Sequence, residues 1–333
     1  MRLFPIVASL LILTGCGGDD TAPTGPVQKV TVRLTLEGVP AWDTVIHGPF
    51  QAWFVDEAGV LYAGDRFALP DAGAVEVTSP IPDPAEVMLS LEPPGDPEIA
   101  PTQLKFLGGR FVDGAAEMSV RGYLTPNLPL EEAPGVHVLG TFAAYGTPDL
   151  PQNQDAGLWF MNPTEDTLSG DYYQDLTPLT QGWVYEGWIV RDMGSPHEVW
   201  MSYGKFRPDG FRQVRFRDDT GLGPFSGKED WERALPFEAR VPGDDWIANP
   251  LGYPLPAGIQ LPLDLNGSPG VPSRWTHVIT IEPYEDRDED PWDAAPMFIR
   301  PYRNAIGEGP PDSLRTVLFT PEELPRGTAT VLR

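Results

Sequence analysis

"KVTVRLTLEG", residues 29–38, decides the class of fold, because apolar and polar side chains alternate along it without a break. An extended chain places Val30, Val32, Leu34 and Leu36 on one side and Lys29, Thr31, Arg33 and Thr35 on the other. A period of two is typical of a β-strand with one buried face and one wet face. The stretch therefore predicts a half-buried strand.

Short runs of similar character recur along the chain: "FQAWFV", "AVEVTS", "EVMLSLEP", "VHVLGTFAAY", "GLWFMN", "YEGWIV", "EVWMSYGKF", "RQVRFR" and "HVITIEP". Pro, Gly, Asp and Asn separate them, and no amphipathic helix of three turns stands out. The 39 prolines and 35 glycines among 333 residues also disfavour long helices. The sequence predicts an all-β protein, built as sandwiches rather than barrels.

Four blocks occur twice in the same order. The first copy reads "PFQAWFVDEAG", "GDRFALPDAG", "VMLSLEP" and "APTQLKFL"; the second reads "VYEGWIVRDMG", "YGKFRPDG", "VITIEP" and "APMFIRPY". The alignment pairs Trp53 with Trp188, Phe67 with Phe206, Glu92 with Glu282 and Pro101 with Pro296. An internal duplication explains the order. It predicts two tandem antiparallel β-sandwich domains, residues 28–122 and 134–333, with a long loop-rich insertion in the second at about 217–272.

The stretch "YEGWIV" predicts a central strand of the second sandwich. Glu186, Trp188 and Val190 share one side, and Tyr185, Gly187 and Ile189 share the other, so both faces are largely apolar. Gly187 would admit a close neighbour. We expect Trp188 and its counterpart Trp53 to lie in the core; the alternative is an exposed aromatic platform for sugars or peptides.

The blocks "GLWFMN", "GWVYEGWIV", "FSGKEDW" and "HVITIEPYEDRDEDP" resemble the extracytoplasmic β-sandwich domain that follows the membrane helix in certain bacterial anti-sigma factors. The resemblance covers about residues 135–304 and, more weakly, 28–110. That family's regulatory half, a cytoplasmic domain and a membrane helix, has no counterpart in this sequence. The resemblance therefore implies a fold and not anti-sigma activity.

The N-terminus combines Arg2, an apolar run over residues 3–13 and the tetrapeptide "LTGC". This pattern resembles the lipobox of bacterial lipoproteins. The resemblance implies a signal peptide over residues 1–15 and a diacylated Cys16 as the mature N-terminus. The alternative is an ordinary secretory signal with an incidental cysteine. Cys16 is the only cysteine, so no disulfide can form within the chain.

Residues 16–27 are small, polar and proline-containing, which is typical of a flexible tether. Residue 17 is Gly; in the lipoproteins that this segment resembles, Asp there favours inner-membrane retention in some bacteria, so we expect the outer membrane. Lys+Arg 23 against Asp+Glu 48 gives a net charge of −25, which disfavours nucleic acid and anionic lipid surfaces as partners. A cation or a basic partner is compatible with this charge.

Two sets of residues are weak ligand candidates. Asp286, Asp288 and Asp290 have the alternate spacing of a calcium loop, but Pro291 and Met297 stand where an EF-hand needs Gly and Glu. We expect a solvated loop, and neither a metal nor a cofactor. The best candidates for exposed, ligand-binding tryptophans lie among acidic residues in predicted loops: Trp231, Trp246 and Trp292.

Motifs of catalysis are missing from the sequence. It contains no G-x-S-x-G, P-loop or H-E-x-x-H pattern, and its four histidines are scattered. We expect a non-catalytic protein, lipid-anchored in the cell envelope, that acts in binding, sensing or surface structure with a protein or glycan partner. The alternatives are a carbohydrate-binding module that uses loop tryptophans, and a hydrolase with carboxylates in the insertion.

Overall fold

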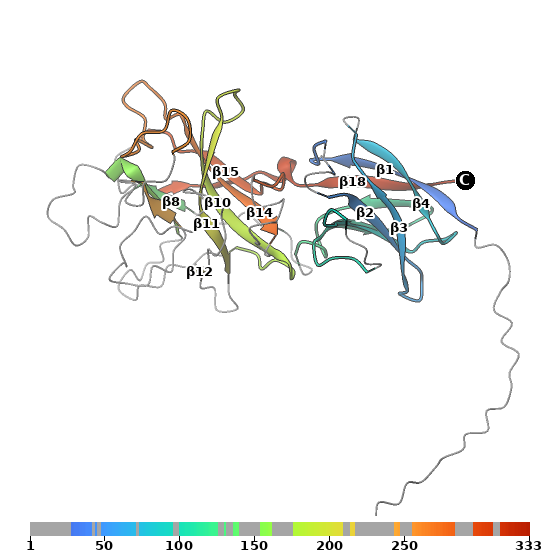
Figure 1. The fold of residues 1–333 in the computed structure, drawn as a ribbon. Coiled ribbons are helices and arrows are strands. Elements are labelled where there is room, and N and C mark those ends of the chain that lie inside the picture. Colours follow the sequence, from blue (N-terminus) through green and yellow to red (C-terminus); the bar gives the residue numbers. More distant parts are fainter. Residues whose placement is uncertain are drawn as a thin grey trace, which may run out of the picture.

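The chain folds into two antiparallel β-sandwiches, one on each side of a narrow junction (Figure 1). This computed structural model describes residues 28–41, 44, 48–70, 73–95, 100–125, 130, 136–139, 154–161, 176–208, 214–216, 243–246, 255–283, 296–308 and 314–333. Among these residues, none forms a helix long and apolar enough to cross a membrane. The all-β prediction is confirmed.

The first sandwich consists of two four-stranded sheets. One has the order β4-β1-β18-β7, with β4 at Ala74–Ser79, β1 at Val30–Glu37, β18 at Arg326–Leu332 and β7 at Ala115–Met118. The other has the order β3-β2-β5-β6, with β3 at Leu61–Phe67, β2 at Phe50–Val55, β5 at Glu86–Leu91 and β6 at Lys105–Arg110. As predicted, β1 buries Val32, Leu34 and Leu36 and exposes the residues between them.

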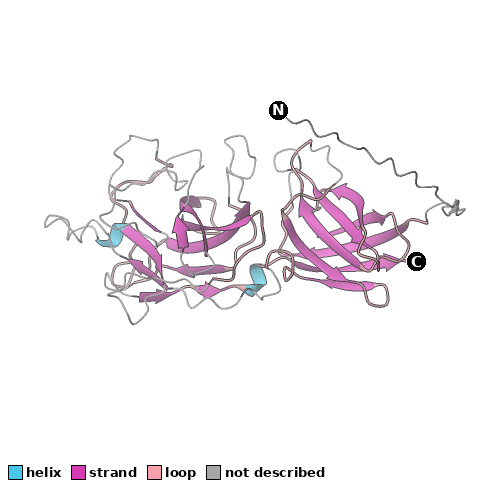
Figure 2. Cartoon of the chain, turned by 90° about the horizontal axis from the view of Figure 1, so that it is seen from below, coloured by secondary structure: helices cyan, strands magenta, loops and turns pink. Residues whose placement is uncertain are grey.

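The second sandwich has a six-stranded and a four-stranded sheet. The larger has the order β12-β11-β10-β14-β15-β17, with bounds Val214–Phe216, Val199–Pro208, Trp183–Arg191, Trp275–Pro283, Tyr302–Ala305 and Leu318–Phe319. The smaller has the order β13-β9-β8-β16, with bounds Gly243–Asp245, Gly157–Met161, Val136–Leu139 and Leu314–Thr316. In the predicted insertion, the described residues contain only one strand, the short β13. Two short 3₁₀ turns, η2 at Gln154–Ala156 and η3 at Pro321–Glu323, complete the elements (Figure 2).

The last strand corrects the predicted domain boundary, which assigned residues 134–333 to the second sandwich. β18 pairs with β1 over seven residue pairs, from Thr31 opposite Leu332 to Glu37 opposite Arg326, and its other edge pairs with β7. In Figure 1 it is the red strand among the blue strands. The second sandwich is thus inserted between β7 and β18, and the end of the chain completes the first sandwich.

One hydrogen bond and a group of aromatic rings hold the two sandwiches together at the junction. The indole N–H of Trp183 donates to the carbonyl oxygen of Lys105 at 3.0 Å. The Phe298 ring lies 6.3 Å from the Phe50 ring and 5.9 Å from the Phe106 ring, centre to centre. One apolar cluster accordingly continues from the first sandwich into the second.

Candidate functional site

Trp53 and Trp188 are buried, 1% and 8% exposed, at the centre of the sheets β3-β2-β5-β6 and β12-β11-β10-β14-β15-β17. Their burial confirms the core prediction over the aromatic platform. Each comes directly after an irregularity in the register with the next strand of its hairpin, β3 or β11. Neither tryptophan belongs to the main apolar cluster, although the neighbours of both do: Ala52 and Phe54 beside Trp53, and Ile189 beside Trp188. Both tryptophans therefore lie on the side of their sheet that faces away from this cluster.

A close contact explains Gly187, which neighbours Trp188. A β-carbon there would lie 1.7 Å from Cζ of Tyr203, so only glycine leaves room for that ring. The Tyr203 hydroxyl reaches Nε2 of His277 at 2.8 Å, and burial holds the pKa of this phenol well above its ordinary value. His277 is thus a structural histidine of the core.

In the first sandwich, a chain of hydrogen bonds runs from the tryptophan to a buried carboxylate. The indole N–H of Trp53 donates to Oγ of Ser90 at 2.8 Å, and this hydroxyl donates to Oε1 of Glu92. The backbone N–H of Thr102, directly after Pro101, donates to the same oxygen at 3.3 Å. Glu92 therefore joins the end of β5 to the segment that leads into β6.

The second sandwich repeats this chain with the residues that the sequence alignment pairs. The indole N–H of Trp188 donates to Oγ1 of Thr280 at 2.9 Å, and the Thr280 side chain bonds to Glu282. The backbone N–H of Met297, directly after Pro296, donates to Oε1 of Glu282 at 2.8 Å. The two sandwiches therefore share the tryptophan, the hydroxyl, the glutamate and the backbone donor.

A buried lysine lies near the glutamate of the second chain of hydrogen bonds. Burial raises the pKa of Glu282 to about 7, and the positive charge of Lys205 opposes that rise. Lys205 is itself 7% exposed, and its ammonium donates to the carbonyl oxygen of Pro283 at 3.2 Å. Glu282 could hold a proton near neutral pH. Glu282 and Lys205 are both buried, however, so a ligand in solution cannot reach them.

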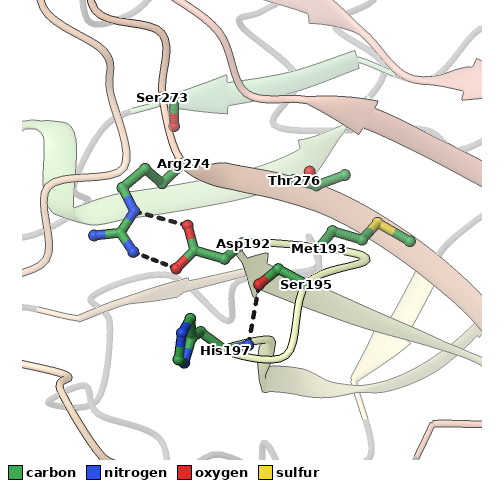
Figure 3. A pocket seen from close by; sticks show the side chains of 7 residues that line it. All are labelled: Asp192, Met193, Ser195, His197, Ser273, Arg274 and Thr276. Carbon is green, nitrogen blue, oxygen red and sulfur yellow. Dashed lines mark hydrogen bonds and ion pairs between the residues drawn. The ribbon is translucent and has the colours of Figure 1, made fainter.

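A surface hollow of about 480 Å³ lies at the other end of β10, where the β10–β11 hairpin meets the start of β14 (Figure 3). Seven residues line it: Asp192, Met193, Ser195, His197, Ser273, Arg274 and Thr276. The Asp192 carboxylate accepts two hydrogen bonds from the Arg274 guanidinium, one from Nε at 2.7 Å and one from Nη2. This partner holds the pKa of Asp192 below its ordinary value. This ion pair links the β10–β11 hairpin to the residue before β14.

The serine, histidine and aspartate of this hollow do not form a hydrolytic triad. Oγ of Ser195 accepts the backbone N–H of His197 at 3.1 Å, which is a turn contact and not an imidazole contact. Both oxygens of Asp192 are taken up by Arg274. The hollow was not predicted: "RDMGSPHE" indicates a turn between strands, but nothing in the sequence pairs Asp192 with an arginine 82 positions away.

The structure corrects one of the ligand candidates from the sequence. Trp246 is fully buried, so the prediction that it is an exposed binding residue is wrong. Its backbone N–H donates to Ala156 and its carbonyl accepts from Leu263, which places it between two segments of the second sandwich. The other candidates lie outside the described residues: Cys16, Trp231, Asp286, Asp288, Asp290 and Trp292. In the part of the chain that is described, no group of three His, Cys, Asp or Glu side chains could hold a metal.

Comparison with known proteins gives no relative: no family model, no curated protein and no solved structure matches the chain. The resemblances to bacterial lipoproteins and to the anti-sigma sandwich domain therefore stay predictions.

Proposed function

We propose that this chain is a lipid-anchored protein of the bacterial cell envelope, without catalytic activity, that acts in binding, sensing or surface structure. The observation that carries the proposal is the "LTGC" motif after an apolar run, with Cys16 as the only cysteine. Two or three acyl chains on this residue would anchor the protein stably, whereas one chain binds only reversibly.

The position of β1 supports an anchor at this end of the chain. β1 begins at Val30, beside Leu332 at the end of β18, whereas its last residue, Glu37, lies opposite Arg326 near the junction. A tether that enters at Val30 would thus place the first sandwich next to the membrane and the second beyond it.

The paired tryptophan-to-glutamate chains support the proposal that the two sandwiches are copies of one unit. The anti-sigma resemblance adds an extracytoplasmic address, because the domain in that family lies outside the cytoplasm. We place the protein in the outer membrane, because residue 17 is Gly and not Asp. Its partner would be a protein or a glycan.

Substitution of Cys16 tests the anchor. Cys16→Ser should have one of two results. The protein should move from the detergent-soluble membrane fraction to the periplasm, or it should accumulate as an uncleaved precursor. Gly18→Ser is the matched control and should remain in the membrane, because it adds the same hydroxyl two residues away. A Cys16→Ser protein that is cleaved normally and still partitions with the membrane would contradict the proposal.

A further inference from the structure

β1, the strand that follows the tether, is bonded on both edges. It makes seven residue pairs with β18 and six with β4, all antiparallel. Its first residues lie at the outer end of the first sandwich, and β18 enters the same sheet from the junction end at Arg326. A pull on the tether and an opposite pull from the junction would therefore act on opposite ends of one strand pair.

We propose that the first sandwich is a load-bearing link, in which β18 clamps the anchored strand β1 against force between the membrane and the second sandwich. This inference rests on the proposed lipid anchor at Cys16. Force along this path runs parallel to the strands. It loads all seven β1–β18 pairs together, whereas force across the strands would open the pairs one after another. Since a single hydrogen bond contributes only about 1 kcal/mol net, shared loading decides whether the pair holds.

The core opposes sliding of β1 as well. Val32, Leu34 and Leu36 point into the sandwich and are fully or almost fully buried. A slip of one residue would turn all three toward solvent, because side chains alternate between the two faces of a strand. Movement along the load direction would therefore break the ladder and expose apolar surface in the same step.

The junction end of the strand pair is closed by two further contacts. The Arg326 guanidinium donates from Nε to Oε2 of Glu37 at 2.8 Å. Gly38, with φ +69°, packs so closely that a β-carbon would lie 2.7 Å from the carbonyl oxygen of Leu324. The chain thus leaves β1 and enters β18 in direct contact, at the point where load would pass to the second sandwich.

Single-molecule pulling in two directions tests the proposal on one protein. The chain from residue 17, without lipid, receives one cysteine handle at Gln28 and a second at Glu322, both exposed. The control keeps the handle at Gln28 and has its second handle after Arg333, beside the start of β1. The first arrangement shears the β1–β18 pair and the second peels it open.

We expect the first sandwich to open at a force at least about twofold higher in the Gln28–Glu322 direction, because seven pairs share that load. The contour length released identifies which sandwich opens. Equal forces in the two directions, or a lower force in shear, would overturn the proposal. Because the protein carries no lipid in this experiment, its result is independent of the fractionation test of Cys16.

Discussion

At the scale of single residues, Glu92 and Glu282 take the same place in the two sandwiches. The alignment puts Lys205 in the second sandwich where the first has Arg66, and Arg66 donates from Nε to Oε1 of Gln51. Lys205 lies near Glu282, and its positive charge opposes the rise in the pKa of that carboxyl. Burial and the charge of Lys205 therefore act in opposite directions on the pKa of Glu282.

Glu282 should make the second sandwich less stable as pH rises. Its folded pKa, about 7, lies above the ordinary value of 4.5, so its stabilising contribution is complete below pH 4.5 and is lost as pH rises through 7. The loss is on the order of 3–4 kcal/mol, at about 1.4 kcal/mol per pKa unit. Glu282→Gln should flatten the change in melting temperature between pH 4.5 and 8.

Glu57→Gln is the control for that experiment, since Glu57 is exposed in the turn after β2. It removes the same charge and should keep the pH dependence of the parent protein. A Glu282→Gln protein with an unchanged pH profile would show that this carboxyl is not the titrating group.

Single residues also show what the sequence could and could not predict. The burial of Trp53 and Trp188 followed from strands that are apolar on both faces. Trp246 was misjudged because acidic neighbours suggested a loop at the surface, whereas two segments distant in the sequence enclose it. When a side chain is buried by segments distant in the sequence, the local pattern of apolar residues does not predict its burial.

At the scale of elements, strands with a regular apolar pattern were predicted, and β18 was not. β1, β2, β5, β10 and β14 have regular apolar patterns and were found. β18 reads "RGTATVL", and Ala329 is its one fully buried residue, so it lacks an apolar stripe. It is a strand because two neighbours, β1 and β7, supply partners for both of its edges. These partner strands lie far from β18 in the sequence, so no local pattern predicts the pairing.

Two adjacent substitutions test this placement of β18. Ala329→Asp buries a charge between Leu34 and Ala116 and should cost roughly 4 kcal/mol or more of unfolding free energy in the first sandwich. Thr330→Asp is exposed and lies opposite Arg33, so it should change stability by less than about 0.5 kcal/mol. Urea denaturation measures both. Similar effects of the two substitutions would contradict the register given for β18.

At the scale of the whole molecule, the two sandwiches meet at a junction, and the end of the chain, β18, completes a sheet of the first sandwich. Trp53→Ala and Trp188→Ala should each cost roughly 3–5 kcal/mol in their own sandwich, as large buried side chains do. Calorimetry should show each variant lowering a different transition. If both variants lower a single indivisible transition, the junction around Phe298 couples the sandwiches into one folding unit.

The proposed function depends first on the N-terminus of the mature protein. Mass spectrometry of protein purified from bacterial membranes tests it most directly, because trypsin should release the peptide from Cys16 to Lys29. We predict that this peptide begins at Cys16 and carries the mass of two or three acyl chains. A mature protein that begins at another residue, or an unmodified Cys16, would contradict the account.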